Sequence, residues 1–240
     1  GGGIKNAENY LDLIKLATRL NIPVVSSPGH GDAIPFNEKL YAGQMGPRGN
    51  PVASQLVKSA DLIFALGTRL GFNSTFYSYH NINKFAKIIH VEADQKSIGR
   101  YFPVTIGICN DVKNAVSQLN FLINKNNIFP DCELWTKNFL KLKKHYYKKR
   151  DENADIKSSP IKPSGLFKKL RNIIPANAAI TLDAGTLCLQ ATDMLNYNNP
   201  RSLFTPLDFG LVGFSFACGL GVKLAKPNIP VFSLMGDGGF

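Results

Sequence analysis

The chain has 240 residues, of which 44% are apolar, 10% aromatic and 19% charged, and its formal net charge is +11. This composition excludes wholesale disorder, collagen and coiled coil, and no window approaches the roughly 20 uninterrupted apolar residues of a membrane span. The length allows one large domain or two of ordinary size. We therefore expect a globular cytoplasmic protein without a membrane partner.

Several local features bear on the class of protein. The first residue is Gly1 and the last residues, Gly236–Phe240, follow directly on a predicted strand, so we expect the chain to be a segment of a longer protein. The four cysteines lie far apart, without a CxxC pair or a histidine at ligand spacing. This pattern favours free thiols in a reducing compartment over a zinc site or a disulfide framework.

In the first half of the chain, apolar runs and periodic segments alternate. The run from Asp61 to Gly67 is typical of a strand covered on both faces, and Asp111 is placed to cap a helix. Strands that alternate with helices imply a parallel sheet with helices on both sides. The expected helices lie over 5–20, over 51–59 and after Asp111, and the expected strands lie over 21–27, 61–67, 87–94 and 104–108.

The stretch from Asn124 to Pro163 is polar, basic and flanked by prolines, which indicates a connection that carries one surface helix. At helical spacing an apolar stripe falls on one side of this helix and the lysines of 141–150 fall on the other. We interpret the lysines as a solvated face and expect no nucleic-acid partner; a nucleic-acid surface is the alternative, supported by charge alone. The stripe consists of Trp135, Phe139, Leu142 and Tyr146.

A second alternating block follows the connection. Ser164 is expected to cap a helix that runs to Ile174. The predicted fold class is therefore α/β, with two parallel-sheet αβα domains: a first, Rossmann-like domain over residues 1–127, a linker over 128–162 and a second, truncated domain over 163–240. In that second domain strands are expected over 178–183, 202–205 and 230–235, and helices over 186–196 and 214–225.

Four glycine-containing turns follow predicted strands. Ligands of open parallel sheets bind outside the carboxyl ends of the strands; a helix that begins after glycines suits a phosphate, and a carboxylate between glycines suits Mg²⁺. Taken singly, each motif is also compatible with an ordinary turn, with Asp183 as a helix cap. The turns are Gly67-Thr68-Arg69, Asp183-Ala184-Gly185-Thr186, Asp208–Gly213 and Gly236-Asp237-Gly238-Gly239.

Taken together, the turns resemble a known family. Gly236-Asp237-Gly238, preceded by Gly210–Phe214 and an apolar helix that ends at Pro227, resembles the diphosphate-binding domain of thiamine diphosphate enzymes. The spacing is similar to that of the acetolactate synthase, pyruvate oxidase and benzoylformate decarboxylase group. The first block resembles the central domain of the same family through Gly43-Gln44-Met45-Gly46, Gly67-Thr68-Arg69 and Val91–Asp94. The resemblance covers nearly all of the chain in the family's order.

The resemblance implies a cofactor site in the second domain. Asp237 would bind Mg²⁺. The carbonyl of Gly210 would accept a hydrogen bond from the aminopyrimidine of the cofactor, and Val212 would be the apolar support that keeps the cofactor folded. The residues that would contact the diphosphate are Gly185, Thr186, Gly236, Gly238 and Gly239.

The resemblance also implies parts that these residues do not supply. The family's activating glutamate lies on a separate pyrimidine-binding domain, so we expect no catalytic residue in this fragment and no turnover by the chain alone. Because the family binds its cofactor between two subunits, the resemblance implies a homodimer or homotetramer. The substrate would be a 2-oxoacid, processed by decarboxylation and carboligation as in acetolactate synthase.

Two alternatives stay open at this point. The central domain binds FAD in acetolactate synthases, and here Arg69 is present but Gly71–Ser74 replaces the charged stretch of FAD-binding members. Sulfoacetaldehyde acetyltransferases, which use no FAD, resemble the chain about as well. Outside the enzymes, the first block alone could be a non-catalytic nucleotide-binding module. For Arg69 the alternative to a ligand contact is an ion pair with Glu92 or Asp94.

Overall fold

The first block is built on parallel strands, as its apolar runs predict. In the computed structural model, which describes residues 1–240, two strands form one sheet and three strands form a second sheet with β4 in the middle. Leu62 pairs with Lys87, and the register continues without a break to Leu66 and Val91. The strands are β1 (Val24–Ser26), β2 (Tyr41–Gln44), β3 (Leu62–Leu66), β4 (Lys87–Glu92) and β5 (Ile106–Cys109).

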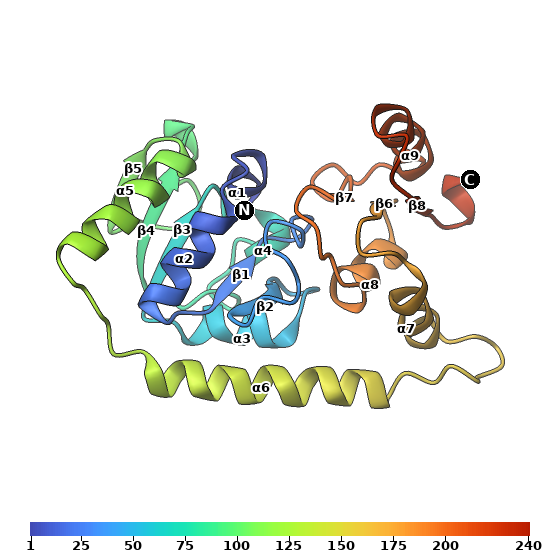
Figure 1. Ribbon diagram of the computed structural model, residues 1–240, viewed down its shortest axis with the longest axis horizontal. Coiled ribbons are helices and arrows are strands. Elements are labelled where there is room, and N and C mark those ends of the chain that lie inside the picture. Colours follow the sequence, from blue (N-terminus) through green and yellow to red (C-terminus); the bar gives the residue numbers. More distant parts are fainter.

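Alternation along β3 divides the core of the first block between two faces. Phe64 and Leu66 pack into one apolar cluster, whereas Ile63 and Ala65 pack into another, because successive side chains of a strand point to opposite faces. The first cluster contains residues of α2 and α5, which lie side by side on the outside of the block (Figure 1). The helices are α1 (Gly2–Asn6), α2 (Tyr10–Leu20), α3 (Pro51–Ser59), α4 (Phe72–Thr75) and α5 (Val112–Lys125).

Two details at helix ends can be compared with the sequence analysis. The Asp111 side chain accepts a hydrogen bond from the backbone N–H of Lys113 at 2.7 Å, so the predicted cap of α5 is confirmed. The prediction of a single helix over 5–20 is wrong, because the chain leaves the helical conformation after α1. Glu8 has a φ of 54° there, which no helix interior allows.

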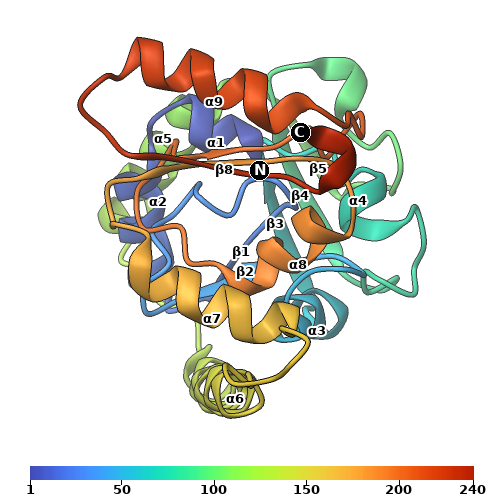
Figure 2. The same ribbon diagram turned by 90° about the vertical axis from the view of Figure 1, so that its right-hand side faces the viewer.

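The second block is a three-stranded parallel sheet in the order β7-β6-β8, so the expected α/β class is confirmed in both blocks. Figure 2 shows α9 on one side of this sheet and α7 and α8 on the other. Ser164 does not cap α7: Lys162 occupies the cap position and no side chain bonds the first turn, which begins with Pro163. The elements are α7 (Pro163–Ile173), β6 (Ala179–Leu182), α8 (Thr186–Met194), β7 (Leu203–Phe204), α9 (Phe214–Ala225) and β8 (Val231–Leu234).

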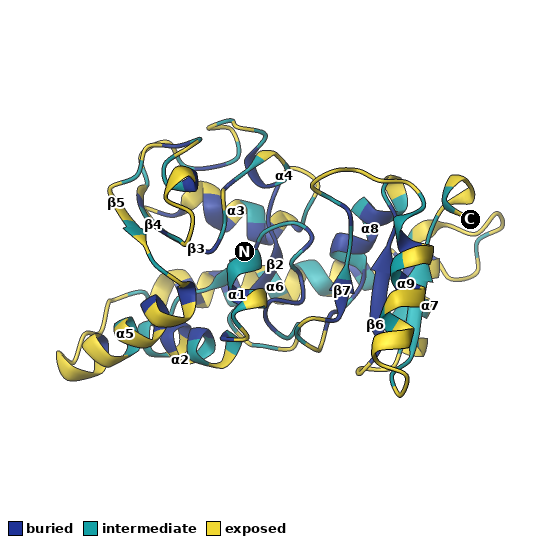
Figure 3. Ribbon diagram, turned by 90° about the horizontal axis from the view of Figure 1, so that it is seen from above, coloured by how far each residue is buried: buried dark blue, intermediate teal, exposed yellow.

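The connecting helix α6 (Glu133–Glu152) runs beneath both blocks (Figure 1). The predicted stripe is half right: Phe139 is 1% exposed, whereas Trp135 and Leu142 are 36% and 52% exposed. The stripe of α6 that faces the two blocks differs from the predicted one, because it includes polar side chains that an apolar pattern cannot reveal. This stripe consists of the buried Thr136, Phe139 and Arg150 and the half-buried Lys143 and Tyr146. Figure 3 shows that the outward faces of the helices are exposed. None of these helices combines the length and the apolar character that a membrane-spanning helix needs.

Asp193, at the end of α8, joins α6 to both blocks. Its carboxylate accepts hydrogen bonds from Asn50 Nδ2 at 2.7 Å and from the hydroxyl of Tyr146 at 2.5 Å. Its backbone carbonyl accepts from Arg150 Nη1 at 2.7 Å. Asn50 also caps α3 by accepting from the N–H groups of Val52 and Ala53. One carboxylate therefore links the first block, the connecting helix and the second block.

We expect Asp193→Asn to lower the free energy of unfolding by about 1–3 kcal/mol, because an amide offers one acceptor where two donors now bind a carboxylate. Urea denaturation followed by circular dichroism measures the change. Asp12→Asn is the matched control: Asp12 pairs with Lys15 at a surface where such pairs contribute about 0–1 kcal/mol. Equal losses in the two variants would contradict the role given to Asp193.

Candidate functional site

Three turns meet at the carboxyl edge of the β7-β6-β8 sheet, in the second block. They follow β6 over residues 183–186, β7 over 205–213 and β8 over 236–239, and parallel pairing places them at one edge. The N–H of Ala184 donates to the carbonyl of Leu211 at 3.3 Å. A Cβ atom at Gly238 would lie 3.7 Å from Cγ1 of Val212. The residues that the sequence predicted for one site are therefore brought together from all three turns.

Asp183 lies at the centre of these turns. It is 1% exposed, and its two carboxylate oxygens accept hydrogen bonds from the N–H groups of Gly213 at 2.9 Å and Ser215 at 3.1 Å. Asp183 is thus a helix cap, but of α9 and not of α8, which follows it in sequence. A Cβ atom at Gly239 would overlap the same carboxylate. The absence of a side chain at Gly239 therefore lets the third turn pack on Asp183.

The other glycines of the turns face open space. Gly185, Gly210 and Gly213 have φ values of +117°, +77° and +87°, a region that side chains disfavour. No atom lies within 4 Å of the position that a Cβ atom would occupy at these three glycines or at Gly236. Gly185 occupies the cap position of α8, so the first N–H groups of that helix follow it directly. The turns form an open cradle of backbone groups.

The side chains around the cradle combine apolar and acidic character. Val212 is 63% exposed and Phe209 is 84% exposed. Asp237 begins the short 3₁₀ turn η2 (Asp237–Gly239) and its carboxylate is exposed. No group of three or more His, Cys, Asp and Glu side chains is placed to hold a metal ion by itself. A cation at Asp237 would therefore need oxygen ligands from the bound molecule, as is usual for Mg²⁺ held by one or two carboxylates and phosphates.

The carboxyl end of β3, in the first block, faces the second turn. Arg69, which follows β3, pairs with Asp208 at 2.9 Å, so the alternative that left it paired with Glu92 or Asp94 is not what the structure shows. The side chain of His30 lies near this pair, and its Nδ1 atom is buried without a hydrogen-bond partner. Burial lowers the pKa of His30 to about 4. The imidazole is therefore neutral at pH 7.

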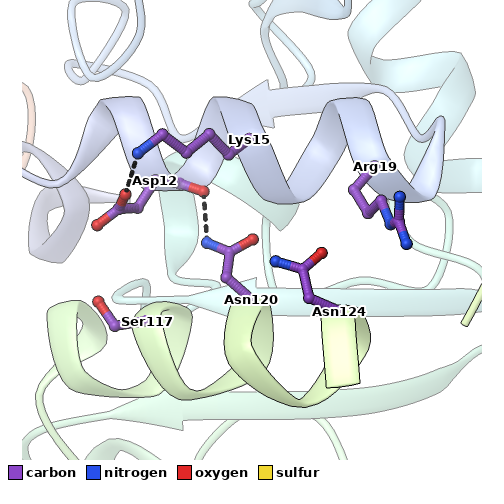
Figure 4. Close-up of a pocket in the computed structure, with 6 residues that line it drawn as sticks. All are labelled: Asp12, Lys15, Arg19, Ser117, Asn120 and Asn124. Carbon is purple, nitrogen blue, oxygen red and sulfur yellow. Dashed lines mark hydrogen bonds and ion pairs between the residues drawn. The ribbon is translucent and has the colours of Figure 1, made fainter. Parts of the chain in front are cut away.

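A separate hollow lies between α2 and α5 of the first block (Figure 4), whereas the glycine turns belong to the second block (Figure 1). Its volume is about 390 Å³ and no apolar side chain lines it. Two of its side chains bind Asp12: Lys15 pairs with the carboxylate at 3.1 Å and Asn120 Nδ2 donates to the backbone carbonyl at 2.9 Å. The hollow is a polar groove between two surface helices and adds nothing to the cradle. Its lining is Asp12, Lys15, Arg19, Ser117, Asn120 and Asn124.

Sequence reasoning missed three contributors to the site: the capping role of Asp183 toward α9, the open position at Gly213, and the contact of Arg69 with Asp208. The first two had a signal, because an aspartate and a glycine at successive strand ends are typical of packed turns. Arg69 and Asp208 are 139 residues apart in sequence. No local pattern could have paired them.

Comparison with known proteins agrees with the cradle. Residues 1–119 match the family model "Thiamine pyrophosphate enzyme, central domain", and residues 183–240 match "Thiamine pyrophosphate enzyme, C-terminal TPP binding domain". The chain belongs to the thiamine pyrophosphate enzymes. The resemblance proposed from the sequence is confirmed, with the cradle inside the matched TPP-binding domain.

Individual relatives of this thiamine pyrophosphate enzyme cover nearly the whole chain. It is 32% identical to the acetolactate synthase large subunit of Buchnera aphidicola subsp. Schlechtendalia chinensis and 31% identical to that of Haemophilus influenzae, each over 99% of the chain and 41% of the relative. It is 28% identical to the sulfoacetaldehyde acetyltransferase of Castellaniella defragrans, over 99% of the chain and 43% of the relative. The chain thus spans about two fifths of the length of these relatives.

The matched TPP-binding domain implies thiamine diphosphate as the cofactor, with the Mg²⁺ typical of this family. The cradle fits this group, because a diphosphate needs backbone N–H groups without overhanging side chains, and the open glycines supply that space. Which of the predicted residues contact the cofactor stays a prediction.

We expect Asp183→Asn to lower the free energy of unfolding by about 1–3 kcal/mol, since the amide can accept only one of the two N–H groups at the start of α9. Thermal unfolding of the cofactor-free chain measures the effect, so that loss of a ligand does not enter. Asp131→Asn, at an exposed position of the linker, is the control and should change stability little. An Asp183→Asn chain as stable as the parent would show that the cap is dispensable.

Proposed function

We propose that the chain carries the central domain and part of the cofactor domain of a thiamine diphosphate- and Mg²⁺-dependent enzyme that acts on 2-oxoacids by decarboxylation and carboligation, in the manner of acetolactate synthase. The observation that carries the proposal is the convergence of three glycine turns around the Asp183 cap, with open space at four of their glycines. The bound cofactor supplies the electron sink for loss of carbon dioxide from the 2-oxoacid.

The residues of the chain would then bind and orient the cofactor. The first N–H groups of α8 after Gly185, with the hydroxyl of Thr186, favour negative charge and would hold the diphosphate together with the third turn. Asp237 would bind Mg²⁺ beside the phosphate oxygens. The Gly210 carbonyl would accept from the aminopyrimidine, and Val212 would support the ring system. The exposure of Val212 leaves its side chain available for that contact.

An activity like that of sulfoacetaldehyde acetyltransferase is the second candidate. It is favoured by the similarity to the Castellaniella enzyme and by the sequence Gly71–Ser74, which lacks the charged stretch expected of FAD-binding members. Binding of FAD to the first block is expected only if the activity is like that of acetolactate synthase. A non-catalytic nucleotide-binding module explains the first block but leaves the cradle of the second without a purpose.

The proposal includes a partner. Residues 163–240 contain no glutamate, so the activating glutamate of the family would come from another domain, across a homodimer or homotetramer interface.

We therefore expect the 240 residues alone to show no repeated turnover of pyruvate with thiamine diphosphate and Mg²⁺. Carbon dioxide released over many turnovers by this chain would contradict that expectation, whereas cofactor binding without turnover agrees with it.

Asp237→Asn should weaken the Mg²⁺-dependent affinity for thiamine diphosphate several-fold at least, because the amide keeps the shape but removes the negative charge that neutralises the metal. Isothermal titration of parent and variant, with Mg²⁺ and with a chelator, measures this effect. The difference should disappear in the chelator.

Asp155→Asn is the matched control for this titration, since Asp155 is exposed and its side chain contacts Lys157 and Lys162 of the linker. Thermal unfolding should show Asp237→Asn as stable as the parent, because strand-end loops contribute little to the core. Equal Mg²⁺-dependent affinity for the parent and Asp237→Asn would remove the residue from the site.

A further inference from the structure

The turn after β7, residues 205–213, is held from the first block as well as from its own. Asn73 Nδ2 donates to the carbonyl of Leu207 at 2.9 Å, and Arg69 Nη2 pairs with the carboxylate of Asp208 at 2.9 Å. Both donors lie in the segment that follows β3. The two contacts reach the turn just before Phe209 and Gly210.

The strand that leads into the turn is anchored to the first block too. Asp32 is fully buried, and one of its oxygens accepts from Lys5 at 2.9 Å and from the N–H of Leu203 at 2.8 Å. Lys5 also donates to the carbonyl of Leu203. A Cβ atom at Gly29 would lie 3.1 Å from Cγ2 of Thr205. Contacts from the first block therefore follow the chain from β7 into the turn.

Within its own block the turn is held chiefly at its two ends. β7 is a strand of two residues, and the N–H groups of Phe209 and Gly210 both donate to the carbonyl of Pro206, inside the turn itself. At the start of the turn, Thr205 Oγ1 lies 3.2 Å from Cys188 Sγ. At its end, the N–H of Ala184 donates to the carbonyl of Leu211 at 3.3 Å and the N–H of Gly213 donates to Asp183 at 2.9 Å. The side chain of Phe209 is 84% exposed, so its apolar packing does not hold the turn in place. Leu207 packs on the apolar core of its own block, but the polar side-chain contacts in the middle of the turn, at Leu207 and Asp208, come from the first block.

We infer that Arg69 and Asn73 are positioning residues, which fix the turn that presents the Gly210 carbonyl and Val212 to the cofactor. The inference rests on the proposed function for the cofactor contacts. It also gives the segment after β3 a role other than holding FAD, because the guanidinium of Arg69 and the amide of Asn73 are directed to the second block.

Hydrogen exchange of the cofactor-free chain tests whether Arg69 and Asn73 fix the turn. Arg69→Ala removes an exposed ion pair and Asn73→Ala removes a partly buried hydrogen bond, so each should speed exchange in a peptide covering 205–213 by up to about five-fold. Arg100→Ala is the matched control, an exposed arginine whose contact is the ring of Tyr101. Unchanged exchange in both Arg69→Ala and Asn73→Ala would overturn the inference.

A charge exchange separates positioning from general damage. Arg69→Asp should speed exchange in the 205–213 peptide, and addition of Asp208→Arg should restore the parent rate, because the pair is reformed with reversed polarity. Exchange in peptides of β3 and α3 reports whether the first block itself is loosened. Faster exchange there that Asp208→Arg does not restore would assign Arg69 to the fold of the first block and overturn the inference.

Cofactor affinity tests the functional part. With Mg²⁺, Arg69→Ala and Asn73→Ala should bind thiamine diphosphate several-fold more weakly than the parent, while Arg100→Ala should match the parent. A loss of FAD binding with unchanged thiamine diphosphate affinity would overturn the inference in favour of a FAD contact. If the parent binds no thiamine diphosphate, the proposed function fails, and the exchange experiment still decides whether Arg69 and Asn73 fix the turn.

Discussion

The cradle depends on the buried carboxylate of Asp183. A carboxylate without partners is costly to bury, but Asp183 receives two N–H groups at the positive end of α9, where a negative charge is favoured. Because Gly239 lacks a side chain, the turn after β8 can approach the same carboxylate. One capping interaction thus fixes the start of α9, the turn before it and the turn after β8. The turns that contain Gly213 and Gly239 therefore keep their places relative to the first turn partly through this residue.

The position of the second block is set by polar contacts more than by a shared apolar core. Two of the three apolar clusters lie in the first block, and one of these includes Phe139 of α6. The third cluster lies in the second block. Between the blocks, Asp193 and Asp32 each accept from more than one donor. Burial raises the pKa of Asp32, and the nearby positive charge of Lys5 opposes that shift. Directional contacts of this kind give the blocks one relative orientation.

Much of the fold was predictable because its elements follow local rules. The bounds of α3 and α9 agree with the sequence analysis residue for residue, since Pro51 and the glycine before Phe214 mark helix starts. The inward face of α6 was not predictable, because Thr136, Lys143 and Arg150 bind backbone carbonyls of distant residues. Strand β2 was missed for a related reason: its sequence, Tyr-Ala-Gly-Gln, has no apolar run.

Two aspartates of the second block show why the site could be predicted only in part. Asp183 and Asp237 each follow or adjoin a strand end and are close to a glycine, so their sequences suggest the same chemistry. In the structure Asp183 is 1% exposed with both oxygens bound to N–H groups, whereas Asp237 is exposed. A carboxylate whose acceptors are already occupied cannot bind a cation without releasing the helix that it caps. Burial and hydrogen bonding therefore leave the carboxylate of Asp237, and not that of Asp183, available to a cation. This agrees with the assignment that the resemblance implies, and the metal role of Asp237 stays a prediction.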